Sequence, residues 1–161
     1  MREHMGLYRG KRIDNGEWVE GYLTGALSGG FWIDESTKLG VPIIRKVDPD
    51  TVGECTGLRD KNGKLIFEGD VFKFPDEVWE SYYTSCGTEY NSWEVENYGV
   101  VGFCDYSGRF EFIRYKFNEN SVEADLHENR EMEFYEFVCE LEIIGNIHDN
   151  PELLKGGEGD G

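Results

Sequence analysis

Three Xaa-Gly turns, each set between short segments that contain apolar residues, constrain the fold of this 161-residue chain most strongly. They are Asn15-Gly16, Asn62-Gly63 and Ser107-Gly108. Asn-Gly supplies the two positive-φ positions of a type I′ turn, whose twist matches the strands of a hairpin. Ser-Gly is a weaker form of the same signal. The sequence therefore predicts three β-hairpins.

A two-residue loop also predicts which residues face each other across a hairpin. In the first hairpin the facing pairs are Ile13 with Trp18, Lys11 with Glu20, and Arg9 with Tyr22. These are an apolar, an opposite-charge and a cation–π pair, so this register is self-consistent. The second hairpin pairs Leu58 with Phe67 and sets Lys61 against Lys64, and the third pairs Phe103 with Phe112 and Cys104 with Glu111.

Repeated short strands with glycine turns are typical of a small all-β barrel. Glycine supplies 21 of the 161 residues, which favours many tight turns. One to three short helices are expected beside the strands. The spacing of Val78, Trp79, Tyr82 and Tyr83 predicts one from about Asp76, a second ends near Val138 before a strand through Ile147, and Asn150-Pro151 begins a one-turn helix.

Charge and composition exclude several classes of partner. The chain has 16 basic and 33 acidic side chains, a net charge of −17, which argues against nucleic acid or an anionic membrane as partner. No apolar run approaches the roughly 18–20 residues of a membrane span, and residues 1–8 lack the apolar stretch of a signal peptide. We therefore expect a soluble, cytoplasmic protein.

The cysteines and histidines show no metal-binding spacing. Cys55, Cys86, Cys104 and Cys139 form no C-x-x-C pair, and the three histidines are scattered. Reduced cysteines that pack as small hydrophobic residues are the expectation for such a protein. We predict neither a metal site nor a cofactor.

The acidic residues are concentrated in the second half of the chain. Residues 1–73 carry 11 basic and 12 acidic side chains, whereas residues 74–161 carry 5 and 21. One interpretation is an anionic surface that imitates nucleic acid, and the other is a solvated face that keeps the protein soluble. The residues of this candidate surface are Glu123, Asp125, Glu128, Glu131 and Glu133.

An insertion at 75–98 is unusually aromatic. Its candidate binding residues are Trp79, Tyr82, Tyr83, Tyr90, Trp93 and Tyr98. Tyrosine and tryptophan favour binding surfaces because they join apolar area to a polar group. The alternative is that these rings pack on the barrel or on a neighbouring subunit. Stacking on single-stranded nucleic acid is disfavoured, because the insertion has no Lys or Arg.

Catalytic motifs are missing from the sequence. There is no phosphate-binding loop, dinucleotide fingerprint, zinc-protease helix or nucleophile elbow. The carboxylate pairs Asp14 with Asp34 and Asp60 with Asp70 lie mostly near turns, where aspartate usually bonds its own backbone. The pair His148-Asp149 adjoins a terminal turn, which favours capping and surface exposure. We predict no catalytic residue.

Six motifs resemble the YopX family of phage and prophage proteins. They are YRGKR (8–12), GEWVEGY (16–22), VDPDTVG (47–53), TGLRDKNGK (56–64), IFEGDV (66–71) and EIIGNIHDNPELL (142–154). Only the insertion and an acidic stretch at 119–133 lie outside the resemblance. The resemblance implies a largely β fold with an SH3-like small barrel, and an origin in a phage, prophage or other mobile element. It implies no enzymatic activity and no catalytic residue.

These observations predict one domain over residues 1–155. Its barrel core occupies 55–74 and 98–147, and 156–161 form a disordered tail. The expected function is that of a non-enzymatic phage or prophage accessory protein in the bacterial cytoplasm. It would act as a protein-interaction or self-assembly module whose partner is another protein or a second copy, forming a homo-oligomer. The alternatives are an acidic, nucleic-acid-mimicking inhibitor of a nucleic-acid enzyme, and an enzyme of unrecognised type.

Overall fold

Ten β-strands in two antiparallel sheets make up most of the computed structural model, which describes residues 6–25, 29–36, 40–116 and 134–154. The strands are β1 (Leu7–Lys11), β2 (Trp18–Gly25), β3 (Phe31–Asp34), β4 (Ile44–Val47), β5 (Gly53–Arg59), β6 (Leu65–Phe67), β7 (Asp70–Thr84), β8 (Gly87–Cys104), β9 (Arg109–Lys116) and β10 (Ile143–Asn146). The helical segments are η2 (Pro49–Thr51), α2 (Phe134–Val138) and η3 (Pro151–Leu154). The prediction of a mainly β chain is confirmed.

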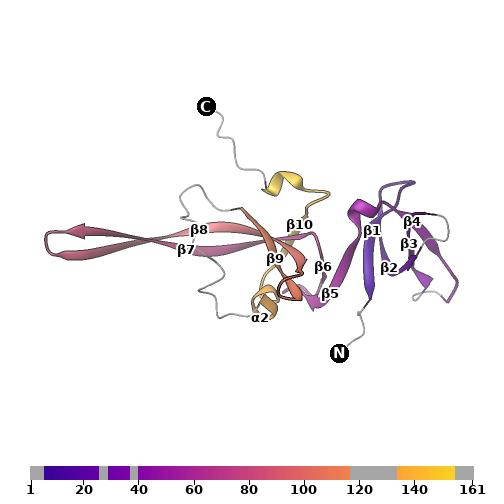
Figure 1. The fold of residues 1–161 in the computed structure, drawn as a ribbon, viewed down its shortest axis with the longest axis horizontal. Coiled ribbons are helices and arrows are strands. Elements are labelled where there is room, and N and C mark those ends of the chain that lie inside the picture. Colours follow the sequence, from indigo (N-terminus) through magenta and orange to yellow (C-terminus); the bar gives the residue numbers. More distant parts are fainter. Residues whose placement is uncertain (1–5, 26–28, 37–39, 117–133, 155–161) are drawn as a thin grey trace.

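The two sheets stay open (Figure 1). The first has the strand order β4-β3-β2-β1-β5-β6, and the second has the order β10-β7-β8-β9. Within the described residues neither sheet closes into a barrel, so the SH3-like barrel is not confirmed. One physical reason is that β7 and β8 run far past their neighbours and leave the body of the protein as a two-stranded ribbon.

Two separate hydrophobic clusters stabilise the sheets. The smaller one lies in the first sheet and contains the buried residues Val19, Ile33 and Val47. The larger one contains Ile66, Phe72, Phe74, Val101, Phe112 and Val138. At its centre the Phe112 ring lies 5.9 Å from Phe72, 5.5 Å from Phe74 and 5.1 Å from Phe134, between ring centroids. The bases of β7, β8 and β9 are therefore anchored in a common core.

The three predicted hairpins form, but their predicted registers are wrong. The observed pairs include Lys11 with Trp18 and Arg9 with Glu20, Arg59 with Leu65 and Cys55 with Phe67, and Phe103 with Phe110 and Cys104 with Arg109. A type I′ turn needs positive φ at both central residues. Here Gly16, Gly63 and Gly108 have φ of 73°, 81° and 67°, and no described non-glycine residue has a positive φ. Each loop is therefore longer than two residues, which shifts the strands.

The helix predicted from about Asp76 is also wrong. The segment continues β7, and its pairing with β8 runs without a bulge from Val71 opposite Val100 to Thr84 opposite Gly87. β-Branched and aromatic residues favour strands. Pairing with β8 then stabilises this segment as a strand rather than as a short helix. The predicted helix that ends at Val138, the strand after it and the terminal turn from Pro151 are confirmed.

Gly99 of β8 allows the Phe112 ring to reach the base of the ribbon. A Cβ atom at Gly99 would lie 2.7 Å from Phe112 Cδ1, closer than real side chains approach. We therefore expect Gly99→Ala to lower the free energy of unfolding by about 1–3 kcal/mol, as overpacking does in other cores. Urea denaturation followed by tryptophan fluorescence measures it.

Gly25→Ala is the matched control for this prediction. Gly25 also lies in a strand, but a Cβ atom there meets no atom within 4 Å. Alanine at Gly25 should leave the midpoint of unfolding unchanged or raise it. If both variants lost the same free energy of unfolding, the close approach of Phe112 to Gly99 would not contribute to stability.

Candidate functional site

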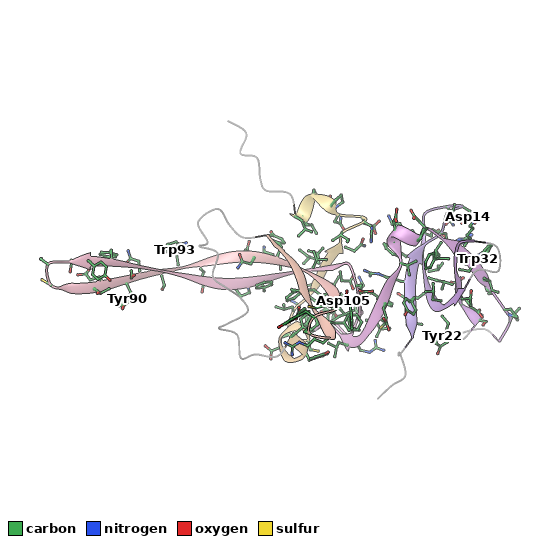
Figure 2. All side chains as sticks on the ribbon, viewed as in Figure 1. Asp14, Tyr22, Trp32, Tyr90, Trp93 and Asp105 are labelled. Atoms are coloured by element: carbon green, nitrogen blue, oxygen red, sulfur yellow. The ribbon has the colours of Figure 1, made fainter. Side chains whose placement is uncertain are left out.

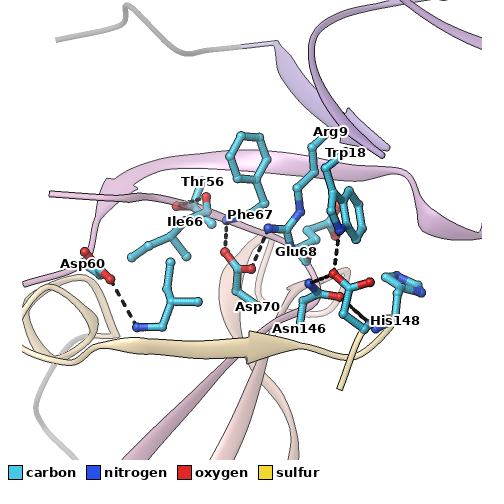
Figure 3. A network of polar contacts seen from close by, with 12 residues as sticks. Arg9, Trp18, Thr56, Asp60, Ile66, Phe67, Glu68, Asp70, Asn146 and His148 are labelled. Atoms are coloured by element: carbon cyan, nitrogen blue, oxygen red, sulfur yellow. Dashed lines mark hydrogen bonds and ion pairs between the residues drawn. The ribbon is translucent and has the colours of Figure 1, made fainter. Parts of the chain in front are cut away.

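A buried ion pair joins the two sheets (Figure 3). Arg9 of β1 and Asp70, the first residue of β7, lie 2.6 Å apart, and their side chains are 8% and 1% exposed. Arg9 also donates from Nη2 to the carbonyl oxygen of Glu68 at 3.0 Å. Its guanidinium carbon lies 4.9 Å from the Trp18 ring centroid and 5.0 Å from that of Phe67. Charge, hydrogen bonding and ring contacts together hold β1 against the start of β7.

The Asp70 carboxylate is the centre of this arrangement. It accepts a hydrogen bond from the Phe67 backbone nitrogen at 2.8 Å. Burial raises the pKa of Asp70, and the positive charge of Arg9 counteracts that rise. Because both charged groups are removed from water, each depends on the other for its solvation.

Asp149 extends the contact to the end of the chain. It forms an ion pair with Lys11 and accepts hydrogen bonds from Trp18 Nε1 at 2.6 Å and Asn146 Nδ2 at 2.9 Å. Partial burial disfavours the charged carboxylate, but these donors outweigh it and lower the pKa of Asp149 to about 2. We call Arg9, Asp70, Lys11, Trp18 and Asp149 the inter-sheet clasp.

His148 lies beside the clasp, with its ring 6.0 Å from that of Trp18. Burial, and then the charges of Arg9 and Lys11, lower its pKa, so the imidazole is neutral at pH 7. A cavity of about 200 Å³ adjoins it, lined in part by Glu68 and Gly69. The Glu68 carboxylate accepts hydrogen bonds from the backbone nitrogens of Glu54 and Phe103. These contacts of His148 and Glu68 indicate a structural role at the junction of the two sheets.

Of the aspartates considered as carboxylate pairs, Asp70 pairs with Arg9 and Asp14 with Arg12, whereas the other two organise turns. Asp60 accepts hydrogen bonds from the backbone nitrogens of Asn62, Lys64 and Ile143, and Asp34 accepts one from Ser36. In the described part of the chain, no group of three or more His, Cys, Asp or Glu residues could hold a metal ion. Nor does any helix there have the length and apolar character needed to cross a membrane.

The ribbon of β7 and β8 is the second candidate site, and we call its residues 74–97 the arm. On β7 the pairing with β10 ends at Phe72, and on β8 the pairing with β9 ends at Tyr98. Phe74 at the base still belongs to the larger hydrophobic cluster, and beyond it the described arm has two strands and extends away from the body of the protein (Figure 1). From Phe74 to Thr84 it spans about 35 Å at the usual rise of a strand.

Four predicted aromatic residues are exposed on the arm, and Figure 2 labels two of them, Tyr90 and Trp93. Tyr83 is 89% exposed, Tyr90 66%, Tyr82 38% and Trp93 37%. Tyr82 donates a hydrogen bond from its hydroxyl to Glu89 Oε2 at 3.0 Å across the two strands. Within the described side chains, none of these four rings belongs to either hydrophobic cluster. Within the described residues these four rings therefore pack in neither cluster, and the alternative that the aromatic residues pack on a neighbouring subunit stays a prediction.

The other two predicted aromatic residues are placed differently. Tyr98 is half-buried at the base of the arm, where its neighbours in register are Lys73 and Lys116. Trp79 is paired in register with Ser92 on the arm, and its side chain lies outside the described part. The structure thus places five of the six residues on the ribbon, four of them with exposed side chains, and leaves Tyr98 at its base.

The arm is acidic throughout. Residues 75–97 contain six Asp or Glu residues and no Lys, Arg or His. Glu89, Glu94 and Glu96 are exposed, and Glu96 pairs with Lys73 at the arm's base, 2.6 Å away. This surface therefore combines exposed rings with a net negative charge.

The predicted acidic surface lies outside the described residues. This concerns Glu123, Asp125, Glu128, Glu131 and Glu133, and the predicted tail at 156–161 lies outside them too. The nucleic-acid-mimic hypothesis for these residues stays a prediction.

Sequence reasoning missed the inter-sheet clasp. Arg9 was expected to face Tyr22, whereas its ring contacts are Trp18 and Phe67. A signal was present in the motif IFEGDV, where Asp70 follows a turn and opens a run of apolar residues. An acidic residue at the start of a buried strand needs a buried partner.

We expect Asp70→Asn to destabilise the protein by about 3–5 kcal/mol, because Arg9 then stays buried without its counter-charge. The double variant Arg9→Met with Asp70→Asn removes both charges and should recover a large part of that loss. Chemical denaturation of the three proteins measures these values. A single variant as stable as the unmodified chain would contradict the role of the clasp.

Asp149 gives the clasp a pH dependence. Its pKa is lower in the folded chain, about 2, than the ordinary value of 3.8. Its charge therefore favours the folded state above pH 3.8, and this contribution is lost as the pH falls from there to about 2. Between those pH values Tm should fall less in Asp149→Asn than in the unmodified chain. Asp105→Asn, at an exposed turn, is the control and should follow the unmodified curve.

Comparison with known proteins gives one match. The sequence model described as YopX protein matches residues 8–155, which is nearly the whole chain. No curated protein and no solved structure matches the chain. The matched span includes the inter-sheet clasp and the complete arm. The chain therefore belongs to the YopX family.

Proposed function

We propose that the chain is a non-enzymatic protein-interaction module, encoded by a phage or prophage, that binds its partner through the arm. The observation that carries the proposal is the exposure of Tyr82, Tyr83, Tyr90 and Trp93 on a ribbon outside both hydrophobic clusters. Large aromatic side chains act as anchors when an interface covers them.

The backbone of the arm supports the same function. A two-stranded ribbon is marginally stable in water, because it has no third strand and no core to cover its faces. In the described part of the chain, no strand is paired with β8 between Thr88 and Glu94 on its side away from β7, and the N–H and C=O groups of such an edge are a template for another chain. A protein partner that covers the arm satisfies these groups and buries the rings at the same time.

The inter-sheet clasp supports a non-enzymatic protein. Its acidic groups are held by Arg9, Lys11 and Trp18, and the neighbouring His148 ring lies 6.0 Å from the Trp18 ring. A general base acts from a position within reach of the proton that it removes. The clasp instead fixes the two sheets, and with them the base of the arm.

Photocrosslinking inside the bacterial host tests the proposal. p-Benzoylphenylalanine replaces Tyr83 or Tyr90 on the arm, and Tyr106 serves as control because it is 100% exposed on the β8–β9 turn. We expect a discrete crosslinked protein from the two arm positions and none from Tyr106. A product that contains only this chain identifies self-assembly through the arm.

A variant with alanine at four arm positions provides the second measurement. Once crosslinking has identified the partner, replacing Tyr82, Tyr83, Tyr90 and Trp93 together should lower the amount of that partner that co-purifies with the chain, without crosslinking, by about tenfold or more, because hot-spot residues dominate interfaces. Tyr106→Ala should leave recovery unchanged. Crosslinks of equal yield from Tyr106 and the arm, or none from the arm, would refute the proposal.

A further inference from the structure

Among the residues that the structure describes, no strand lies beside one edge of the arm. Residues Thr88 to Glu94 of β8 pair with β7 on one side. On the other side, β9 pairs only with Tyr98 to Cys104. In an antiparallel ribbon, alternate residues direct their N–H and C=O groups outward. Within the described chain, this edge is therefore a row of backbone donors and acceptors open to an added strand.

Both faces of this edge carry the same two kinds of group. Side chains alternate between faces along a strand, so Tyr90 and Glu94 lie on one face, and Glu89 and Trp93 lie on the other. All four are exposed. An added strand would therefore meet an aromatic ring and a carboxylate whichever way its side chains point.

The charge of the arm indicates which kind of strand can bind at this edge. A second copy of the chain carries the same net charge of −17, and its arm has the same six acidic residues. Residues 117–133 of the chain itself contain six acidic residues and one arginine, so their sequence does not supply a cationic strand. A cationic occupant is instead attracted to the acidic arm.

We propose that the β8 edge of the arm binds an extended, Lys/Arg-rich segment of a protein partner as an added strand. This inference rests on the proposed function and names the chemistry of its partner. Backbone pairing supplies the affinity in such a complex, and alternate side chains supply the specificity. The cations of the segment meet Glu89 and Glu94, and they stack on the faces of Tyr90 and Trp93.

Three fluorescent peptides of about ten residues, the length that covers this edge, test the proposal on the full chain. The first alternates Arg and Val, and the second has the same side chains with N-methyl groups on alternate backbone nitrogens. The third alternates Glu and Val. Fluorescence anisotropy at about 0.15 M salt should show the first binding about tenfold tighter than the other two, because only it has both charge and pairing groups.

Matched charge variants locate the binding. The test variant removes three carboxylates of the arm at once, through Glu89→Gln, Glu94→Gln and Glu96→Gln. It should bind the Arg peptide about tenfold more weakly than the unmodified chain does. The control variant is Asp105→Asn, Glu140→Gln and Glu152→Gln, which removes the same charge from exposed positions off the arm. It should change affinity by less than about twofold. Bound peptide should also slow hydrogen exchange at the outward amides of residues 88–94.

The outcomes separate this inference from the proposed function. Equal binding of the N-methylated peptide, or an equal loss in the control variant, indicates diffuse attraction and overturns the inference. If no peptide binds while crosslinks from Tyr83 and Tyr90 still capture a partner, the inference fails and the arm remains an interaction element. If the crosslinks come instead from Tyr106, the proposed function fails as well.

Discussion

The buried pairing of Arg9 with Asp70 is the interaction on which the rest of the structure depends. Arg9 belongs to the first sheet, and Asp70 is the residue at which β7 begins. Each charge is stable away from water only because the other is present. The clasp therefore determines where β7 starts, and the continuous pairing of β7 with β8 carries that position out to the arm.

Much of the secondary structure could be predicted, whereas the strand registers could not. Alternating residues and glycine turns located the hairpins, and Asn150-Pro151 located the last turn. The registers were wrong because only one residue of each Xaa-Gly pair has a positive φ, a property that composition does not show. The helix predicted from about Asp76 rested on Val78, Trp79, Tyr82 and Tyr83, which also favour strands. Pairing with β8 makes this segment a strand.

For the candidate site, too, the sequence predicted which residues are involved but not their surroundings in the fold. Sequence alone identified the aromatic insertion, but exposure depends on whether a third strand covers the ring. Tyr98 lies where β9 still pairs with β8 and is half-buried, whereas Tyr83 lies where two strands remain and is almost fully exposed. The clasp was hidden for a related reason: Arg9 and Asp70 are far apart in the sequence, and only the folded chain brings them together.

The unbroken pairing of β7 and β8 has a mechanical consequence. The same two strands form the outer arm and, through Phe72, Phe74 and Val101, part of the larger hydrophobic cluster. Antiparallel hydrogen bonds run perpendicular to the strands. A pull along the arm therefore loads the bonds to β9 and β10 in shear, all at once, instead of opening them one by one. A partner held at the tip would be tethered to the body without a hinge.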